Sequence, residues 1–297
     1  MDRIKGILMI IIGSISWGAT GPIMEWLLST TEITPSFMLA VRLIIAGTLL
    51  LAFLHVKGTN VFAIWRQATW RNQLFIFSMV GMLGLQFTFV KTIEESNAIV
   101  ATLLQFLAPI FIILYVSITH KKWPPKAQVI GIIGTLCGLF LLLTNGSLSS
   151  LMVSETALIW GVAVGLTYAF YTLYPARLMK EWGVLVVVAW GFVLSGMELS
   201  IIGRIWATDE WGLLANSTVM WMIAGLVIFG TVAFVLFLSS MKYITAVETS
   251  VLSSFEPVTA TIISVLWLGS VMQMWQVVGI MLMLVFVAYL SIAGKKE

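Results

Sequence analysis

Apolar residues occupy most of the chain in ten long stretches, separated by short polar segments. Each stretch has about the length of a membrane-crossing helix, because a hydrocarbon core of roughly 30 Å takes about 20 helical residues. The pattern therefore predicts an all-α integral membrane protein with ten transmembrane helices. The predicted spans are 4–28, 36–56, 74–92, 97–119, 128–144, 156–175, 183–205, 219–240, 247–268 and 272–293.

Composition supports this class of protein. Of the 297 residues 60% are hydrophobic and 10% charged, whereas about 25% of an average soluble domain is charged. Ten spans leave little chain for a soluble domain, so the function is expected within the helix bundle. Cys137 is the single cysteine and lies in an apolar span, while His55 and His120 lie at span ends. We therefore expect neither an internal disulfide nor a metal or other cofactor.

The basic residues predict the orientation in the membrane. Basic side chains collect on the cytoplasmic loops of membrane proteins, and 13 of the 16 fall on one face if both termini are cytoplasmic. The net charge of +3 is then a topology signal, and we expect no nucleic-acid partner. The chain is predicted to be a multi-pass plasma-membrane protein, a monomer or homodimer. The 13 residues are Arg3, Lys5, Lys57, Arg66, Arg71, Lys121, Lys122, Lys126, Arg177, Lys180, Lys242, Lys295 and Lys296.

The two halves of the chain resemble each other. A shift of 148 residues places Pro109 on Pro257, and the run Q-V-I-G-I at 128–132 on Q-V-V-G-I at 276–280. Five spans per half, an odd number, would insert the halves in opposite orientations. This predicts one membrane domain of two inverted five-helix repeats, residues 1–145 and 146–297. Many secondary transporters are built in this way, although a channel or a membrane enzyme can also carry a duplication.

Several short motifs are similar to those of EamA-type members of the drug/metabolite transporter superfamily. They are the pair Trp17–Gly18, the run R-L-I-I-A-G at 42–47, and the segments that end in Pro109 and Pro257. The resemblance covers the whole chain. It implies ten helices with both ends cytoplasmic, and amino acids, amines or related metabolites as substrates.

The resemblance also implies a division of labour among the helices. Helices one to four and six to nine are expected to surround a central cavity, while helices five and ten buttress the repeats. In this chain the buttresses would be 128–144 and 272–293, neither of which contains a charged residue.

Charged residues within spans are candidates for coupling or gating, because a charge at mid-membrane costs about 2.5–3.5 kcal/mol on insertion scales. Glu25 and Arg42 both fall in the outer third of their spans, where they could form a structural ion pair, an outer gate or an anchor for an anionic group. Glu198 lies in the outer half of the seventh span, within reach of Arg204 near the surface.

Glu256 lies near the middle of the ninth span and directly precedes Pro257. Proline removes a backbone donor and frees a carbonyl one turn earlier, which makes this stretch polar and able to bend. A carboxyl group at this depth is a candidate for proton coupling or for recognition of a cation. The alternative is a protonated side chain that is hydrogen-bonded within the bundle.

A second group of candidates consists of polar and aromatic residues away from the span ends. Tyrosine hydroxyls and amides in a membrane need partners or water, so they are expected to face inward, and aromatic rings beside a carboxylate can hold an organic cation. Packing between helices is the alternative role for each of them. With Glu256, the candidate substrate-binding residues are Trp17, Thr20, Gln86, Gln105, Tyr168 and Tyr171.

A secondary active transporter of small metabolites, working by alternating access and coupled to protons, explains these features best. An enzyme is disfavoured because the chain has no Cys/His metal set, no G-x-S-x-G and no paired acids at helical spacing, and a Walker loop is absent as well. The alternative is a flippase for a lipid-linked carrier, which would need an intramembrane basic site for phosphate; only Arg42 qualifies. Charge favours a cation or zwitterion as the substrate over an anion.

Overall fold

The structure is a computed structural model that describes residues 2–147, 151–240, 242–244, 249 and 252–293. These residues form helices and no strands. The α-helices are α1 (Asp2–Thr30), α2 (Pro35–Val56), α3 (Ala68–Ile76), α4 (Gly84–Glu95), α5 (Ala98–Gln105), α6 (Ala108–His120), α7 (Lys126–Thr144), α8 (Glu155–Leu173), α9 (Ala176–Trp182), α10 (Val184–Gly203), α11 (Ser217–Ser240), α13 (Phe255–Trp267) and α14 (Met274–Ala293). A π-helical segment η2 (Phe77–Leu83) joins α3 to α4, and 3₁₀ turns lie at η1 (Ala63–Arg66), η3 (Ile205–Ala207) and η4 (Asp209–Ala215).

In the described residues, eight helical segments are long and apolar enough to cross a membrane, and they correspond to the first eight predicted spans. Two further apolar helices, Phe255–Trp267 and Met274–Leu290, are shorter and lie in the ninth and tenth predicted spans. Residues 245–248 and 250–251 of the ninth span lie outside the described residues. The described residues thus form an all-α membrane protein in which eight helices have spanning length.

Two predicted spans differ from the helices that form. The third helix begins at Ala68, six residues before the predicted start, and runs to Glu95 through the π-helical segment. The fourth span is divided into α5 and α6, with a break at Phe106 and Leu107. The break follows from Pro109, which has no N–H to continue the helical hydrogen bonds and is tolerated in the first turn of a new helix.

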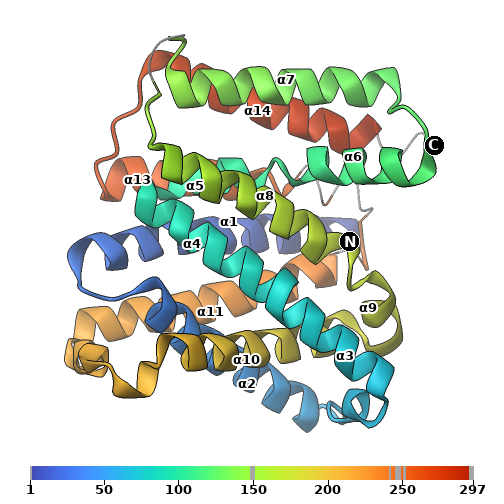
Figure 1. The fold of residues 1–297 in the computed structure, drawn as a ribbon, viewed down its shortest axis with the longest axis vertical. Helices are drawn as coiled ribbons and strands as arrows, with labels where there is room; N and C mark the ends of the chain where they lie inside the picture. The colour runs from blue at the N-terminus through green and yellow to red at the C-terminus, as the bar shows by residue number, and fades with distance from the viewer. Residues whose placement is uncertain (1, 148–150, 241, 245–248, 250–251, 294–297) are drawn as a thin grey trace.

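The helices form a layered bundle (Figure 1), with α7 and α14 packed against each other at one edge. At the opposite edge α2 packs against α10. Between these pairs α1 contacts α11 and α13, and α8 contacts α4, α5 and α6. The largest hydrophobic core lies between α1, α2, α10 and α11, around side chains such as Phe37, Leu43 and Phe192.

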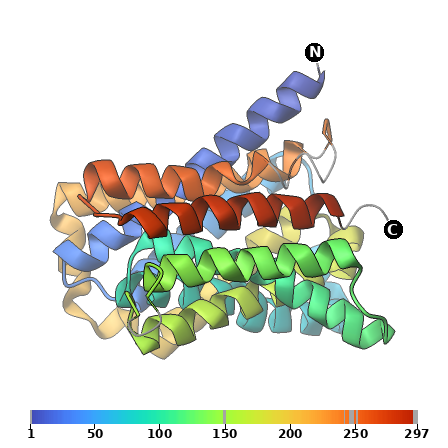
Figure 2. The ribbon, with the colours of Figure 1, turned by 90° about the horizontal axis from the view of Figure 1, so that it is seen from above.

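The start of α1 and the end of α14 lie toward the same end of the bundle in both views (Figures 1 and 2). In Figure 1 the end of α2, the link from α6 to α7, and α9 also lie at this end. These are the segments that carry most of the basic residues of the chain.

Candidate functional site

Two places where a helix begins or ends close to a proline lie next to each other in the bundle. Helix α5 ends at Gln105 just before Pro109, and α13 begins just before Glu256 and Pro257. Gln105 Nε2 donates a hydrogen bond of 3.3 Å to Glu256 Oε1, and both side chains are buried, at 8% and 7% exposure. The break within the fourth span and the start of α13 in the ninth are therefore joined by a polar contact between residues 151 positions apart.

Helix α1 packs directly against this contact. A Cβ atom added at Gly18 would overlap with the backbone carbonyl oxygen of Glu256 and would lie 2.9 Å from the Cβ of Thr259. Only glycine therefore allows α1 and α13 to approach this closely. The glycine of the Trp17–Gly18 pair is a site residue that sequence reasoning used only as a family mark.

Trp17, the residue before Gly18, belongs to an aromatic cluster that connects α1, α8 and α11. Its ring centroid lies 4.8 Å from that of Phe234 and 5.9 Å from that of Phe237. Phe234 in turn lies 6.5 Å from Tyr171, whose ring is 6.0 Å from that of Tyr168. We call Trp17, Gln105, Tyr168, Tyr171 and Glu256 the Glu256 cluster, since Tyr168 also lies within electrostatic range of Glu256.

Thr20, the remaining candidate on α1, hydrogen-bonds its own helix. Its hydroxyl donates a hydrogen bond of 2.7 Å to the backbone carbonyl of Trp17. Thr20 is buried, with 2% of its surface exposed. A threonine hydroxyl used in this way needs no other partner. The structure therefore gives the Thr20 hydroxyl a partner within its own helix, the backbone of Trp17.

A second group of buried polar residues surrounds Arg42 on α2. The guanidinium Nη1 donates to Oε1 of Gln86 on α4 at 3.3 Å, and Arg42 is 4% exposed. On the other side it lies against α11, where a Cβ added at Gly230 would be 2.9 Å from Nη2. We call Arg42, Gln86 and Gly230 the Arg42 cluster.

Glu25 and Arg42 do not form the ion pair that their depths suggested. The Glu25 carboxylate instead accepts a hydrogen bond of 2.7 Å from the backbone N–H of Ala98, the first residue of α5. The first N–H groups of a helix have no partner within it, so they compete well for a nearby carboxylate. Asn97 caps the same helix, accepting from the N–H of Val100 at 2.9 Å.

Glu198 likewise has a different partner from the predicted Arg204. Its Oε1 accepts a hydrogen bond of 3.2 Å from Ser78 Oγ, at the start of the π-helical segment, and its Oε2 is buried without a hydrogen-bond partner. Ser195 Oγ donates to the carbonyl oxygen of Ser78 at 3.0 Å. Both serines were missed from the sequence, where the only signal is a polar residue at mid-span. π-helical segments occur frequently at functional sites.

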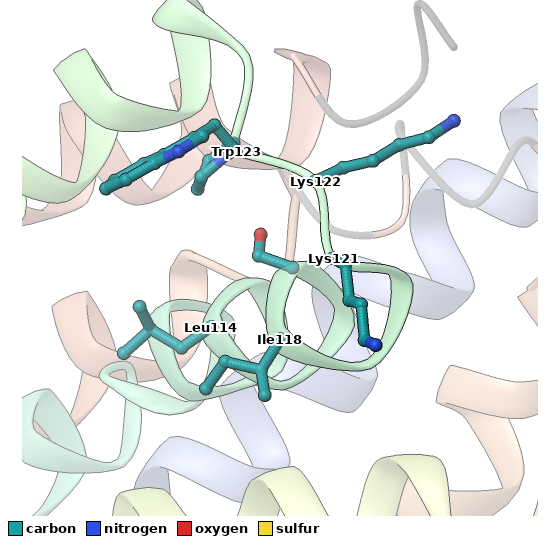
Figure 3. A pocket seen from close by; sticks show the side chains of 7 residues that line it. Leu114, Ile118, Lys121, Lys122 and Trp123 are labelled. Atoms are coloured by element: carbon teal, nitrogen blue, oxygen red, sulfur yellow. The ribbon is translucent and has the colours of Figure 1, made fainter.

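A surface pocket of about 290 Å³ lies apart from these residues (Figure 3). It is formed by the last turns of α6 and by the link to α7, and Figure 3 shows Trp123 extending above Leu114 and Ile118 while Lys121 and Lys122 point elsewhere. None of the candidate residues lines it. In the described part of the chain, no group of three or more His, Cys, Asp or Glu side chains could hold a metal ion.

Comparison with known proteins gives a consistent result. The EamA-like transporter family matches residues 4–144 and 155–292. The chain is 32% identical over 294 residues to the uncharacterized inner membrane transporter YicL of Salmonella typhimurium, covering 99% of this chain and 97% of YicL. It is 26% identical to the uncharacterized transporter YwfM of Bacillus subtilis, covering 98% of this chain and 95% of YwfM.

A solved crystal structure shares the fold. It covers 99% of this chain and 100% of its own, with a TM-score of 0.68 at 16% sequence identity, so the likeness concerns the fold alone. Three findings lead to one assignment. The family matches both halves of the chain, the relatives are transporters, and the apolar helices have spanning length. The chain is a multi-pass membrane transporter that belongs to the EamA-like transporter family.

Proposed function

We propose that this transporter is a secondary active carrier that moves amino acids, amines or related cations and zwitterions across the plasma membrane by alternating access coupled to protons. The observation that carries the proposal is the hydrogen bond between Gln105 and Glu256. This hydrogen bond supports the proposal because it joins an ionisable residue in 146–297 to a residue in 1–145, near interruptions where helices can bend.

Alternating access requires two halves that move relative to each other, and we propose that residues 1–145 and 146–297 are inverted repeats. The helix contacts support this, because exchanging each helix with its counterpart 148 residues away converts one contact into another. The contact of α1 with α11 corresponds to that of α8 with α4, and the contact of α1 with α13 corresponds to that of α8 with α6. The pairs α2–α10 and α7–α14 convert into themselves. The family also matches each half separately.

The proposed substrate site is a central cavity beside the Glu256 cluster. Trp17, Tyr168 and Tyr171 are only half-buried, although Tyr171 packs against Phe77 of the π-helical segment and Phe234 of α11. Aromatic rings next to a carboxyl group suit an organic ammonium group. In this proposal the Glu256 carboxylate binds the substrate ammonium or a proton. When neither is bound, the hydrogen bond from Gln105 holds the Glu256 side chain in place.

Replacing Glu256 with Gln tests the proposal, because the amide keeps the size and hydrogen bonding of the side chain but cannot ionise. Uptake driven by a pH gradient into vesicles that contain the purified Glu256→Gln protein is expected to fall to the level of empty vesicles. Exchange of substrate without a gradient survives if Glu256 only couples, and fails if the carboxylate holds the substrate.

The matched control is Glu198→Gln, which changes the carboxyl group in the outer half of the seventh span, at the Ser78 contact. Its uptake is expected to stay near that of the wild type. Wild-type rates and pH dependence in Glu256→Gln vesicles, together with loss of uptake in Glu198→Gln, would instead assign coupling to Glu198.

We also propose that both termini are cytoplasmic, since α1 begins and α14 ends at the end of the bundle whose segments carry most of the basic residues. Single cysteines at Thr59 and Ser217, both exposed, test this in a Cys137→Ser background. In intact cells an impermeant thiol reagent is expected to label position 217 and to reach position 59 only after permeabilisation. The reverse pattern would contradict the orientation.

A further inference from the structure

The surface pocket at the end of α6 combines apolar and basic side chains. It has a volume of about 290 Å³, and its lining includes Leu114, Ile118, Lys121, Lys122 and Trp123. In Figure 3 Trp123 extends above Leu114 and Ile118, while the side chains of Lys121 and Lys122 extend in other directions. The pocket therefore has an apolar side and a cationic side.

The backbone at the end of α6 fixes the place of the two lysines. The N–H of Lys121 donates to the carbonyl of Ile118 at 3.2 Å, and the N–H of Lys122 to the carbonyl of Ser117 at 3.0 Å. Lys121 has left-handed backbone angles, with φ 52° and ψ 38°. Glycine adopts these angles without strain and is the usual residue at such a helix end. A lysine thus occupies a position where backbone geometry alone would favour glycine.

The pocket lies where an apolar helix reaches the membrane surface. The apolar segment Ala98–His120 ends next to it, and Trp123 beyond the end is 95% exposed. Tryptophan is enriched at the level of the lipid headgroups. Leu114 and Ile118, which are exposed and one turn apart on the same face of α6, lie deeper, toward the acyl chains. The pocket is therefore placed to contact both the headgroup and the chain of a lipid.

The charge around the pocket favours an anion. Lys121, Lys122 and Lys126 lie within six residues, and no Asp or Glu occurs in the sequence between Glu95 and Glu155. Among the described residues no side chain caps the start of α7 at Lys126. The first N–H groups of α7 therefore add positive potential on this side of the link.

The apolar side of the pocket restricts what kind of anion fits. A phosphate ion would use the lysines but would leave Leu114, Ile118 and Trp123 without a contact. A phospholipid of net negative charge fits both sides, because its phosphate lies at the membrane surface while its acyl chains extend into the hydrocarbon core. Basic pockets between membrane helices are suited to such headgroups.

We infer that this pocket binds an anionic phospholipid. Lys121 and Lys122 bind the phosphate, one acyl chain lies along Leu114 and Ile118, and Trp123 covers the glycerol region. The bound lipid joins the end of α6 to the link that leads into α7. This site is separate from the Glu256 cluster, and the inference does not depend on what the protein transports.

Lipid binding to the purified protein tests the inference. The wild-type protein is stripped of lipid in detergent and titrated with phosphatidylglycerol, with phosphatidylcholine of the same acyl chains, and with inorganic phosphate. Binding is measured by native mass spectrometry and by thermal unfolding. Phosphatidylglycerol is expected to bind about tenfold more tightly than phosphatidylcholine, since a charged hydrogen bond is worth this much. Inorganic phosphate at the same concentration is expected to leave Tm unchanged.

Variants then locate the site. Lys121→Gln/Lys122→Gln is expected to lower the affinity for phosphatidylglycerol about tenfold or more. The matched control, Arg66→Gln/Arg71→Gln, removes the same charge from two exposed positions on the link between α2 and α3 and should bind as the wild type does. Lys121→Gly relieves the backbone strain, so it is expected to be at least as stable as the wild type without lipid and still to bind phosphatidylglycerol more weakly.

Three outcomes would overturn the inference. Equal binding of phosphatidylglycerol and phosphatidylcholine, or of neither, would show that the wild-type pocket does not select an anionic lipid. Equal stabilisation by inorganic phosphate would make the pocket a phosphate site. An equal loss of affinity in the arginine control would mean that the attraction belongs to the whole basic end of the bundle. None of these measurements involves a transported molecule, so each result leaves the proposed function as it stands.

Discussion

Two helix pairs hold the protein together in different ways. In each pair, one helix comes from the first half of the chain and the other from the second half. The pair α7–α14 packs backbone against backbone: a Cβ at Gly138 would lie 2.7 Å from the carbonyl oxygen of Gly279, and one at Gly279 would lie 2.6 Å from that of Gly138. Neither helix is interrupted, and α14 has no charged side chain.

The pair α5–α13 meets through side chains instead. Both helices begin or end near a proline, and their contact includes the buried hydrogen bond from Gln105 to Glu256. Close glycine contacts in lipid favour one fixed arrangement, because small residues allow extensive van der Waals packing. A single hydrogen bond between interrupted helices can be exchanged for another partner. If the proposed alternating access holds, α7–α14 keeps the two halves in a fixed contact and α5–α13 is the contact that rearranges.

The largest effect on folding is expected from Gly138→Ala in the fixed pair. The added methyl group would meet backbone atoms of both Gly279 and Met283, which have no freedom to move aside, and overpacking of this kind costs about 1–3 kcal/mol. The loss of stability is measured by heating the purified protein and determining the folded fraction by size-exclusion chromatography. The control is Leu136→Ala, at an exposed position of the same helix. Equal stability of the two variants would contradict the assignment of a fixed contact.

Gly18→Ala is expected to affect transport more than folding. The new methyl group would separate α1 from α13 at the carbonyl of Glu256, where the interrupted helix can shift to relieve the overlap. Uptake per folded molecule should fall severalfold, with a smaller loss of thermal stability than for Gly138→Ala. A variant that loses stability but transports normally once folded would show that α1 and α13 are as rigidly joined as α7 and α14.

The smallest effect is expected at the outer end of α5. Glu25→Ala removes the carboxylate that accepts from Ala98, and a lost helix cap costs about 1 kcal/mol. Asn97→Ala, which removes the other cap, is expected to cost a similar amount. Thermal unfolding of the two single variants and of the double variant measures how much each cap contributes to stability. Loss of transport in Glu25→Ala at unchanged stability would return Glu25 to a gating role.

Much of the site was predictable because prolines and membrane-embedded charges have strong local consequences. Pro257 predicted a stretch that can bend, and α13 begins two residues before it, whereas the break before Pro109 within the fourth span was not predicted. The depth and isolation of Glu256 singled it out, and the structure adds Gln105 as its partner. The sequence did not predict the extension of the third helix to Ala68 or the π-helical segment. These depend on contacts with α8 and α10, which lie far along the chain.

The partners of the charged residues were the main error. Similar depth suggested that Glu25 could pair with Arg42, and nearness along the chain that Glu198 could pair with Arg204. Neither depth nor nearness fixes the direction in which a side chain points. The structure directs Glu25 to a helix start and Glu198 to Ser78, and leaves Arg42 with an amide.

The sequence by itself determined that the chain is a helical membrane protein. It also determined which side chains are too polar to face the lipid. Both follow from hydrophobicity and helix length, which are properties of short segments. Tertiary structure decided which of these residues meet, because helix–helix contacts depend on the rotation and close approach of segments whose contacting residues lie 44 to 151 positions apart. Glycines such as Gly18, Gly138 and Gly230 control that approach, and their role becomes visible only when the facing helix is in place.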